Sequence, residues 1–485
     1  MTRRLVCTDL EDSCVSSPTS APSSSEPHQR TVSAFSFIDL FAGIGGFHHA
    51  LEALGGKCVL ASEIDESCRK VYLATWPAFP PQALVGDIRG LTQLPDGSDR
   101  PLSELALLVP DHDVLAAGFP CQPFSKSGAQ RGIADRTRGT LFFDIMRIVE
   151  AKRPRYIILE NVRNLAGPRH ADTFATIIAA LREAGYRVAK APVVLSPHLL
   201  SPVEGGAPQH RERVFVLAQR VETGAADKDL DLGLKRAPSL GWDPATWTID
   251  SVLLDDDKIE HIERYRLAPE DEAALRAWQA FVQMIPSDDL PGFPIWADYL
   301  VARPRYPVDV PDWKRDFIDK NHQFYLRHKG VVDAWRKISW VSSGALRVDD
   351  FTASRRKFEW QARTAQPHRA DRDLTKLAIQ FRPSGVRVKP LNYLPTLVAI
   401  TQTSYIGPRR RYLTPIEVAR LQGFPDTTFG GGVVEDKQAY KQAGNAVHVG
   451  VVRHAARRLF EMTGAPWSTR GTVSEELGGR EPSGE

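Results

Sequence analysis

The chain has 485 residues, of which 42% are hydrophobic and 25% are charged, and its formal net charge is +3. These proportions are typical of globular proteins, and the length predicts two or three domains. Five cysteines without paired spacing, no visible signal peptide and no apolar run of membrane-spanning length argue against secreted disulfide scaffolds and membrane proteins, so we expect a soluble cytoplasmic protein.

The two ends of the chain differ in composition from the rest. Residues 1–34 are rich in serine and proline and show no apolar periodicity, and residues 464–485 resemble them. Such segments cannot bury enough apolar surface to offset the entropy lost on ordering. We therefore predict a disordered tail at each end.

Short apolar runs alternate with amphipathic segments between about 35 and 220, which is typical of a parallel α/β sheet. The first helix should follow a glycine turn and run to about residue 54. Further helices are expected over 139–152 and 171–184. Strands are expected at 35–40, 58–62, 84–85, 114–117, 156–159 and 214–218.

Chemically suggestive residues follow successive predicted strands. In open α/β sheets the carboxyl ends of the strands form the edge at which ligands bind. We therefore expect one crevice to be faced by the glycine turn at 43–46, Glu63, Asp87, Cys121 and Glu160.

The alternating pattern stops near residue 220, and irregular sequence rich in proline and tryptophan continues to about 385. This stretch is too long for a loop, so we interpret 221–385 as an inserted domain. Residues 221–300 hold 7 Lys and Arg against 17 Asp and Glu, whereas 301–415 hold 23 against 10. A basic block interleaved with aromatic residues favours phosphate contact, although a solvated charged surface would explain any single cluster equally well.

Regular structure returns in the segment 386–463. Thr414, Pro415 and Glu417 predict a helix start with a capping box. A turn is expected at Gly444-Asn445, followed by a last amphipathic helix over 447–460.

The glycine turn has the pattern Gly43-x-Gly45-Gly46, which differs from the dinucleotide pattern G-x-G-x-x-G. A close backbone approach followed by a helix start still fits a nucleoside cofactor. Glu63 lies 20 residues beyond Gly43, about the spacing at which an acid meets ribose hydroxyls. A cofactor site is therefore favoured over a merely tight turn.

Cys121 lies between Pro120 and Pro123, on a stiff loop just past a predicted strand. A thiolate is a nucleophile where basic neighbours or a helix start lower its pKa. Taken alone, a single cysteine is more often a small buried apolar residue.

Taken together, these motifs resemble those of the DNA (cytosine-5) methyltransferases. The resemblance covers about 36–219 and 380–461, with the motifs in the family's order. The matching segments are 37–47 (the S-adenosylmethionine loop), Glu63 and Asp87 (the ribose and adenine acids), 118–125 (the nucleophile loop), 160–162 (the acid motif), 209–213 (Q-x-R-x-R), Pro395-Thr396 and 442–445 (the closing cofactor motif).

The resemblance implies a Rossmann-like S-adenosylmethionine-dependent methyltransferase domain, in two parts (35–220 and 386–463), with a target-recognition domain inserted at 221–385. Cytosine carbon 5 becomes nucleophilic once a thiolate adds to carbon 6, a role given to Cys121. Glu160 would act at N3 and Arg213 at O2, with Arg211 orienting Arg213 or lowering the thiol pKa. Contacts to DNA are expected from Gln122, Ser125 and Thr396.

Contacts to S-adenosylmethionine are implied for backbone and side chains along the same sheet edge. The residues are Phe41, Ala42, Gly43, Ile44, Gly45, Gly46, Glu63, Ile64, Asp87, Ile88, Pro120, Leu141, Asn445 and Ala446. Ala446, where many relatives have serine, and His448 depart from the family pattern at positions whose side chains the chemistry does not need.

The implied substrate is double-stranded DNA, with the target cytosine flipped out of the helix. We expect a monomer that acts at the nucleoid and is paired genetically with a restriction endonuclease. A tRNA cytosine-5 methyltransferase is disfavoured by the long insert, and a silent DNA-binding regulator by the intact Cys121, Glu160 and arginines. A dehydrogenase is disfavoured by the glycine pattern.

Overall fold

In the computed structural model, the described residues are 33–120, 141–189, 191–222, 224–286, 289–341, 346–362, 372–397 and 403–467. The chain divides into a segment of residues 1–33 and a unit of residues 34–485. Everything below concerns the second unit. The predicted first tail therefore lies almost wholly outside the described residues.

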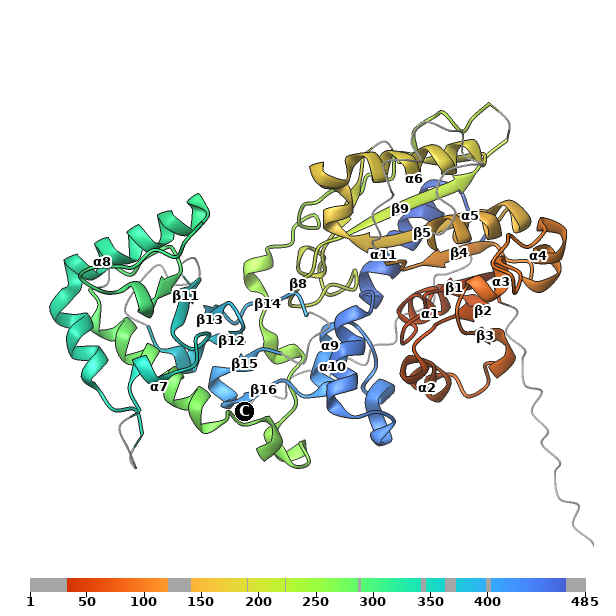
Figure 1. Cartoon of the computed structure of the whole chain (residues 1–485). Helices are drawn as coiled ribbons and strands as arrows, with labels where there is room; N and C mark the ends of the chain where they lie inside the picture. Colours follow the sequence, from red (N-terminus) through yellow and green to blue (C-terminus); the bar gives the residue numbers. More distant parts are fainter. Residues whose placement is uncertain are drawn as a thin grey trace, which may run out of the picture. The chain divides into compact units, whose positions relative to one another are not determined.

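The first sheet has the strand order β3-β2-β1-β4-β5-β9-β6, and β7 pairs with β9 (Figure 1). The first five strands of this order are parallel, whereas β9 runs antiparallel to β5, β6 and β7. Their bounds are β1 Phe35–Leu40, β2 Gly56–Ser62, β3 Leu84–Val85, β4 Val114–Ala117, β5 Tyr156–Val162, β6 Tyr186–Val188, β7 Val193–Leu195 and β9 Arg213–Arg220.

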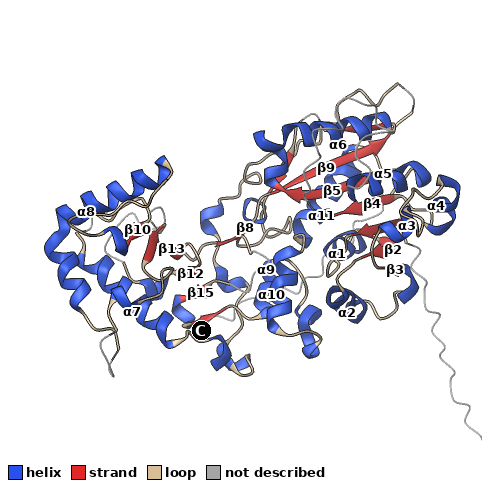
Figure 2. Cartoon of the chain, viewed as in Figure 1, coloured by secondary structure: helices blue, strands red, loops and turns tan. Residues whose placement is uncertain are grey.

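Helices cover both faces of this sheet (Figure 2). Successive side chains of a strand point to opposite faces, so Phe35 and Phe37 join one core and Ile38 and Leu40 the other. One face packs against α1 Gly46–Glu52, α2 Glu66–Thr75, α9 Pro415–Leu421, α10 Asp436–Asn445 and α11 Val449–Met462, and the other against α3 Arg89–Thr92, α4 Leu102–Leu108, α5 Leu141–Lys152 and α6 Ala171–Glu183.

A second sheet, in the order β10-β11-β13-β12-β15-β16, has its own apolar core with α7 and α8. Trp278 and Trp335 are fully buried there, with ring centroids 5.0 Å apart. The bounds are β10 Ile295–Trp296, β11 Lys357–Trp360, β12 Ala378–Arg382, β13 Gly385–Lys389, β15 Tyr405–Ile406, β16 Arg411–Tyr412, α7 Pro269–Met284 and α8 Asp312–Lys337; the short strands β8 Gln209–His210 and β14 Leu394–Pro395 pair with each other.

The predicted limits of the insert, 221 and 385, do not coincide with the change of core. Leu230, Leu232 and Ile249 pack into the core of the first sheet, whereas Tyr405 packs into the second. The second sheet also includes β15 and β16, beyond residue 385. The separate apolar core therefore begins near residue 267 and takes in residues up to 412.

Two predictions near the C-terminus were wrong in detail. Gly444 and Asn445 are the last residues of α10 and do not form a separate turn, and the final helix is α11, Val449–Met462. The predicted tail at 464–485 also begins too early, because Ala465 is buried and Trp467 stacks on Phe35. Residues 468–485 lie outside the described residues.

Candidate active site

The loop after β1 carries three residues in the left-handed backbone region, with φ of 59° at Phe41, 57° at Gly43 and 84° at Gly45. A Cβ at Gly45 would lie 2.3 Å from the Trp76 ring, whereas a Cβ at Gly43 would meet no atom within 4 Å. Gly45 is therefore required for packing. Gly43 instead borders open space, which suits close approach by a ligand.

Glu63 links the glycine loop to the start of α2. Its Oε2 accepts a hydrogen bond from the backbone N of Gly43 at 2.8 Å, and its Oε1 accepts one from the backbone N of Asp65 at 2.7 Å. Each carboxylate oxygen keeps a second acceptor site. The side chain is thus held against the loop and can still accept hydrogen bonds from a ligand. The neighbouring Ile64 is 67% exposed.

Asp87 follows β3 and is engaged by its neighbour Arg89. Oδ2 of Asp87 accepts from Nη2 of Arg89 at 2.6 Å, and this contact holds the pKa of Asp87 below its ordinary value. The side chain is therefore an ionised acceptor. Of the other predicted cofactor contacts, Ile88 is buried in the core, Leu141 is half-buried at the start of α5, and Pro120 is exposed.

Glu160 and Arg213 form an ion pair across the β5–β9 ladder. Nε of Arg213 lies 3.0 Å from Oε1 of Glu160, and Glu160 is only 7% exposed. Burial raises the pKa of the Glu160 carboxyl despite the opposing effects of Arg213 and Arg211. The carboxyl therefore takes up a proton at a higher pH than an exposed glutamate does. Glu160 lies inside β5, which extends beyond the predicted end of the strand.

The chain that leads toward Cys121 passes beside this pair. A Cβ at Gly118 would lie 3.7 Å from Oε2 of Glu160. Nδ2 of Asn161 donates to the backbone oxygen of Phe119 at 2.8 Å, fixing the loop to the residue next to Glu160. The sequence placed Asn161 within the acid motif 160–162 but indicated no separate role for it. The predicted Cys121, Gln122 and Ser125 lie outside the described residues.

Arg211 is 2% exposed and its guanidinium is bound to backbone oxygens. Nη1 donates to Leu397 at 3.0 Å, and Nη2 donates to Gly444 at 3.0 Å and Ala446 at 2.7 Å. Burial, and then Arg213, lower the pKa of Arg211 to about 9. Among the described residues, the side chain therefore connects its own segment with Leu397 and with the segment 444–446. The sequence did not predict this structural role.

Thr396 and Asn445, two other predicted contacts, lie close to the ends of these segments. The Thr396 hydroxyl donates to the backbone oxygen of His210 at 2.7 Å, so within the described structure it ties β14 to β8. Asn445 is exposed at the end of α10, whereas Ala446 is 8% exposed.

Helix α10 brings the closing motif next to the acids at the sheet edge. Nε2 of Gln442 donates to the Ser67 hydroxyl at 3.0 Å, and Lys441 lies 3.4 Å from Asp65. A Cβ at Gly46 would lie 2.5 Å from a Val447 methyl group. The structure therefore brings together the glycine loop, the start of α2 and the 442–447 segment. The sequence predicted that the glycine loop and Glu63, just before α2, would lie together at the carboxyl ends of the strands.

His448 takes a structural position at the start of α11. Its Nδ1 accepts a hydrogen bond from the backbone N of Val451 at 3.2 Å, which caps the helix. Burial, and then Arg211, lower the pKa of His448 to about 3, so the ring is neutral and can accept this bond. This departure from the family pattern thus has a local explanation.

The described residues contain neither a candidate metal site nor a helix that could span a membrane. Among the described residues, no three His, Cys, Asp or Glu side chains are grouped as a metal site would require. None of the helices in the described parts of the chain has the length and apolar character needed to cross a membrane.

The chain is similar to known proteins over most of its length. The type II methyltransferase M.AluI of Cellulosimicrobium cellulans is 38% identical, with 87% of this chain and 91% of that protein covered. M.NlaX of Neisseria lactamica is 31% identical, with 88% and 96% covered, and M.BanI of Aneurinibacillus aneurinilyticus is 30% identical, with 88% and 95% covered.

The family described as C-5 cytosine-specific DNA methylase matches residues 35–461, a range that spans both sheets and every predicted motif. The parallel sheet with helices on both faces is the Rossmann-like methyltransferase fold that the sequence predicted. The chain belongs to the C-5 cytosine-specific DNA methylase family and is a DNA (cytosine-5) methyltransferase of the restriction-modification type.

Proposed function

We propose that this enzyme methylates carbon 5 of one cytosine in a specific double-stranded DNA sequence, as a monomer, with S-adenosylmethionine as methyl donor and Cys121 as covalent nucleophile. The observation that carries the proposal is the buried Glu160–Arg213 pair beside the loop that leads to Cys121. A carboxyl with a raised pKa next to a guanidinium suits a ring that gains negative charge. The Cys121 thiolate would add to carbon 6 of a cytosine flipped out of the duplex.

Glu160 would donate its proton to N3 of the ring as the thiolate adds, and Arg213 would hold Glu160 in place and approach O2. Arg211 would act as a positioning residue, because its bonds to Leu397, Gly444 and Ala446 hold the sheet edge together. Gln122, Ser125 and Thr396 remain proposed DNA contacts. Reading of the target sequence is assigned to the second core, from about 267 to 412.

The donor site fits the residues at the sheet edge. Gly43 leaves open space beside the backbone, and the Glu63 and Asp87 carboxylates stand at the ends of β2 and β3 as acceptors for ribose hydroxyls and an adenine amino group. When bound, S-adenosylmethionine supplies an electrophilic methyl group. The residues that would hold it are 41–46, Glu63, Ile64, Asp87, Ile88, Pro120, Leu141, Asn445 and Ala446.

Bisulfite sequencing tests the proposal as a whole. We expect cytosines within one short motif to be protected in plasmid and host DNA after expression in a methylation-free bacterium. Protection of that motif would also fit a role in shielding host DNA from a partner endonuclease. Protection of tRNA cytosines alone would favour the tRNA reading, and no protected cytosine in either would contradict methyl transfer by this chain.

The raised pKa of Glu160 predicts how the rate should depend on pH. Because the protonated acid is the active form, the methyl transfer rate under single-turnover conditions should fall as pH rises through that raised pKa. Glu160→Gln should lower the methyl transfer rate by about 10²- to 10⁴-fold and should remove the decrease in rate with rising pH.

The control is Glu150→Gln, because Glu150 on α5 also has a raised pKa, caused by partial burial, but lies on the solvent side of its helix. This variant should keep both the methyl transfer rate and its decrease with rising pH. If the rate of Glu160→Gln decreased with rising pH just as that of the unaltered protein does, Glu160 would not be the proton donor.

A further inference from the structure

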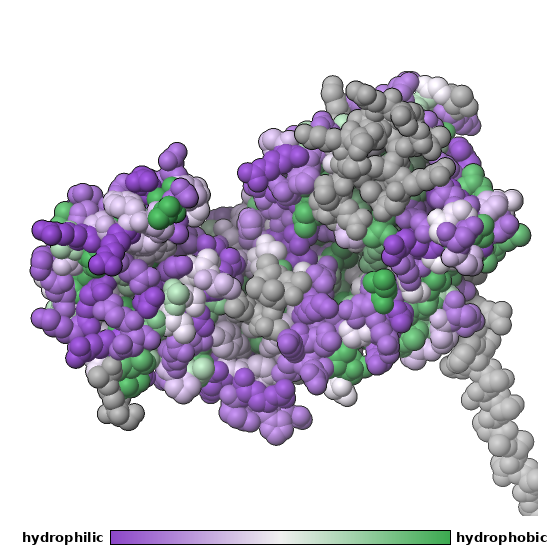
Figure 3. Space-filling model, viewed as in Figure 1, coloured by the Kyte–Doolittle hydropathy of each residue, from purple (hydrophilic) through white to green (hydrophobic). Residues whose placement is uncertain are grey.

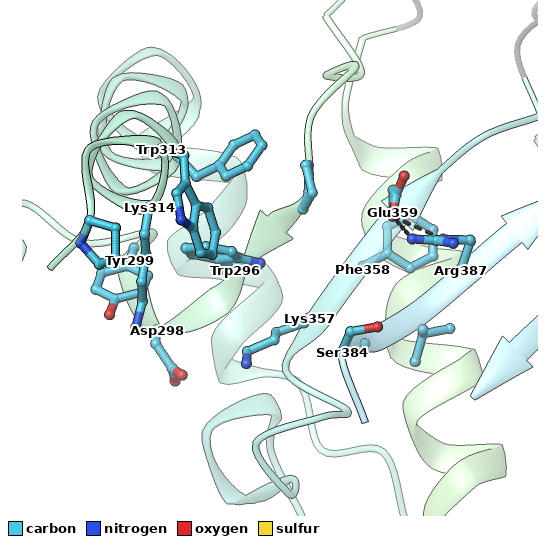
Figure 4. Close-up of a pocket in the computed structure, with 15 residues that line it drawn as sticks. Trp296, Asp298, Tyr299, Trp313, Lys314, Lys357, Phe358, Glu359, Ser384 and Arg387 are labelled. Atoms are coloured by element: carbon cyan, nitrogen blue, oxygen red, sulfur yellow. Dashed lines mark hydrogen bonds and ion pairs between the residues drawn. The ribbon is translucent and has the colours of Figure 1, made fainter. Parts of the chain in front are cut away.

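A cavity of about 620 Å³ opens in the part of the chain built on the second sheet (Figure 4). Its walls come from β10 and the turn after it, the start of α8, β11 and the β12–β13 turn. Pockets of 300 to about 1,000 Å³ are typical of small-molecule sites. Its lining residues lie within the second core, to which reading of the target sequence is assigned, but none of them takes part in the proposed chemical step.

One side of the cavity is aromatic. Trp296, Trp313 and Phe317 lie near one another, with the Phe317 centroid 5.7 Å from Trp296 and 6.2 Å from Trp313, and the Tyr299 ring lies 5.8 Å from Trp296. Trp313 is 60% exposed, although the surface over α8 is largely hydrophilic (Figure 3). Large apolar rings on such a surface favour a flat ligand that stacks on them.

The cavity lining also holds acidic and basic side chains. Glu359 is neutralised by Arg387, whose Nη2 and Nε lie 2.7 and 2.9 Å from Oε2 (Figure 4). Asp298 is paired with Arg356 at 2.8 Å. Both acids in the lining are therefore balanced by arginines.

Two lysines in the lining, Lys314 and Lys357, have no carboxylate within ion-pair distance among the described residues. Lys357 extends from β11 toward the aromatic side (Figure 4). Lys314 belongs to the first turn of α8, which is kinked at the non-helical His328, and the N-terminal dipole of its first part also favours an anion. The cavity therefore combines aromatic stacking surfaces with uncompensated positive charge.

We infer that this cavity binds a nucleotide, with the base against Trp313 and its neighbouring rings and the phosphate near Lys314 and Lys357. A neutral aromatic ligand would not use the lysines, and an ammonium ligand would be repelled by them. The same chemistry is offered by a free nucleotide and by an unpaired nucleotide of a DNA strand. This inference goes beyond the methyl transfer and does not rest on it.

The test uses the full chain with saturating S-adenosylhomocysteine, so that any nucleoside site at the glycine loop is filled. Calorimetric titration at one fixed salt concentration should show binding of 2′-deoxyadenosine 5′-monophosphate and weaker binding of 2′-deoxyadenosine. Trp313→Ala should weaken nucleotide binding about tenfold, as expected for loss of one base–aromatic contact. Lys357→Met should weaken nucleotide binding but not nucleoside binding.

Leu326→Ala is the matched control, because Leu326 is a 50% exposed apolar residue on the same helix. A duplex with one unpaired adenine, compared with the fully paired duplex, identifies the source. A preference for the unpaired adenine that Trp313→Ala removes would mean a nucleotide in a strand, whereas binding of the monophosphate alone would mean a free nucleotide. Equal binding by Trp313→Ala and the unaltered protein, or tighter binding of tetramethylammonium, would overturn the inference.

Discussion

Replacing Cys121 by alanine should lower methyl transfer to cytosine by at least about 10⁴-fold, which is the scale on which enzymes lose activity without their nucleophile. Carbon 5 of cytosine cannot take a methyl group until carbon 6 has been attacked, so no other group compensates. DNA binding should persist, because phosphate and base contacts do not need the thiol. The measurements are methyl incorporation from labelled donor and equilibrium binding to a duplex that contains the methylated motif.

Cys68→Ala supplies the matched control for this substitution. Cys68 is a free, buried cysteine on α2, and burial, together with Glu63 and Asp65, raises its pKa to about 12, so it does not form a reactive thiolate near neutral pH. The control variant should keep turnover. Retained turnover in Cys121→Ala would remove the covalent mechanism from consideration.

Replacing Glu417 by alanine should lower the free energy of unfolding by about 3–5 kcal/mol, the usual loss when one partner of a buried ion pair is removed. Glu417 and Arg411 are both 0% exposed, and two hydrogen bonds of 2.8 Å join them. Glu417 also accepts from the backbone N of Thr414 and of Leu254. Among the described residues, the substitution would leave the buried Arg411 with Asp256 as its remaining carboxylate partner, beside the backbone oxygens of Leu254 and Tyr412. Urea denaturation followed by tryptophan fluorescence measures the loss.

A neighbouring, more exposed pair supplies the control. Arg420, on α9, and Asp426, in the turn that follows, form an ion pair whose side chains are 28% and 51% exposed, so Arg420→Ala should cost no more than about 1 kcal/mol. Replacing both Arg411 and Glu417 by methionine should recover most of the stability, because no buried charge remains. Equal losses for Glu417→Ala and Arg420→Ala would mean that the buried pair contributes little.

The sequence was sufficient to predict six of the eight strands of the first sheet, because local signals agreed there, but it did not predict β6 and β7. Strands such as 35–40 and 114–117 are short apolar runs with turns behind them, and the structure has them with the same bounds. The capping box of Thr414 and Glu417 was confirmed as well. In each case the information lies within a few consecutive residues.

The parts that the sequence could not predict depend on contacts between distant segments. Nothing near Arg211 indicates that its guanidinium meets carbonyl groups 186 to 235 residues further along the chain. Gly444 and Asn445 have turn composition, yet they complete α10, whose Gln442 donates to the Ser67 hydroxyl and whose Gly444 oxygen accepts from Arg211. The second core differs in extent from the predicted insert for the same reason, because Leu230 and Ile249 have no local mark of the core that they join.

The packing of α11 against α1 has a consequence for synthesis on the ribosome. Phe460 lies edge-on to Phe35, so the first strand is covered only after about 400 further residues have been added. At about 5–20 residues per second that interval is roughly 20–80 s. During this time the nascent chain exposes an apolar sheet face, and we expect it to depend on chaperones until the last helix emerges.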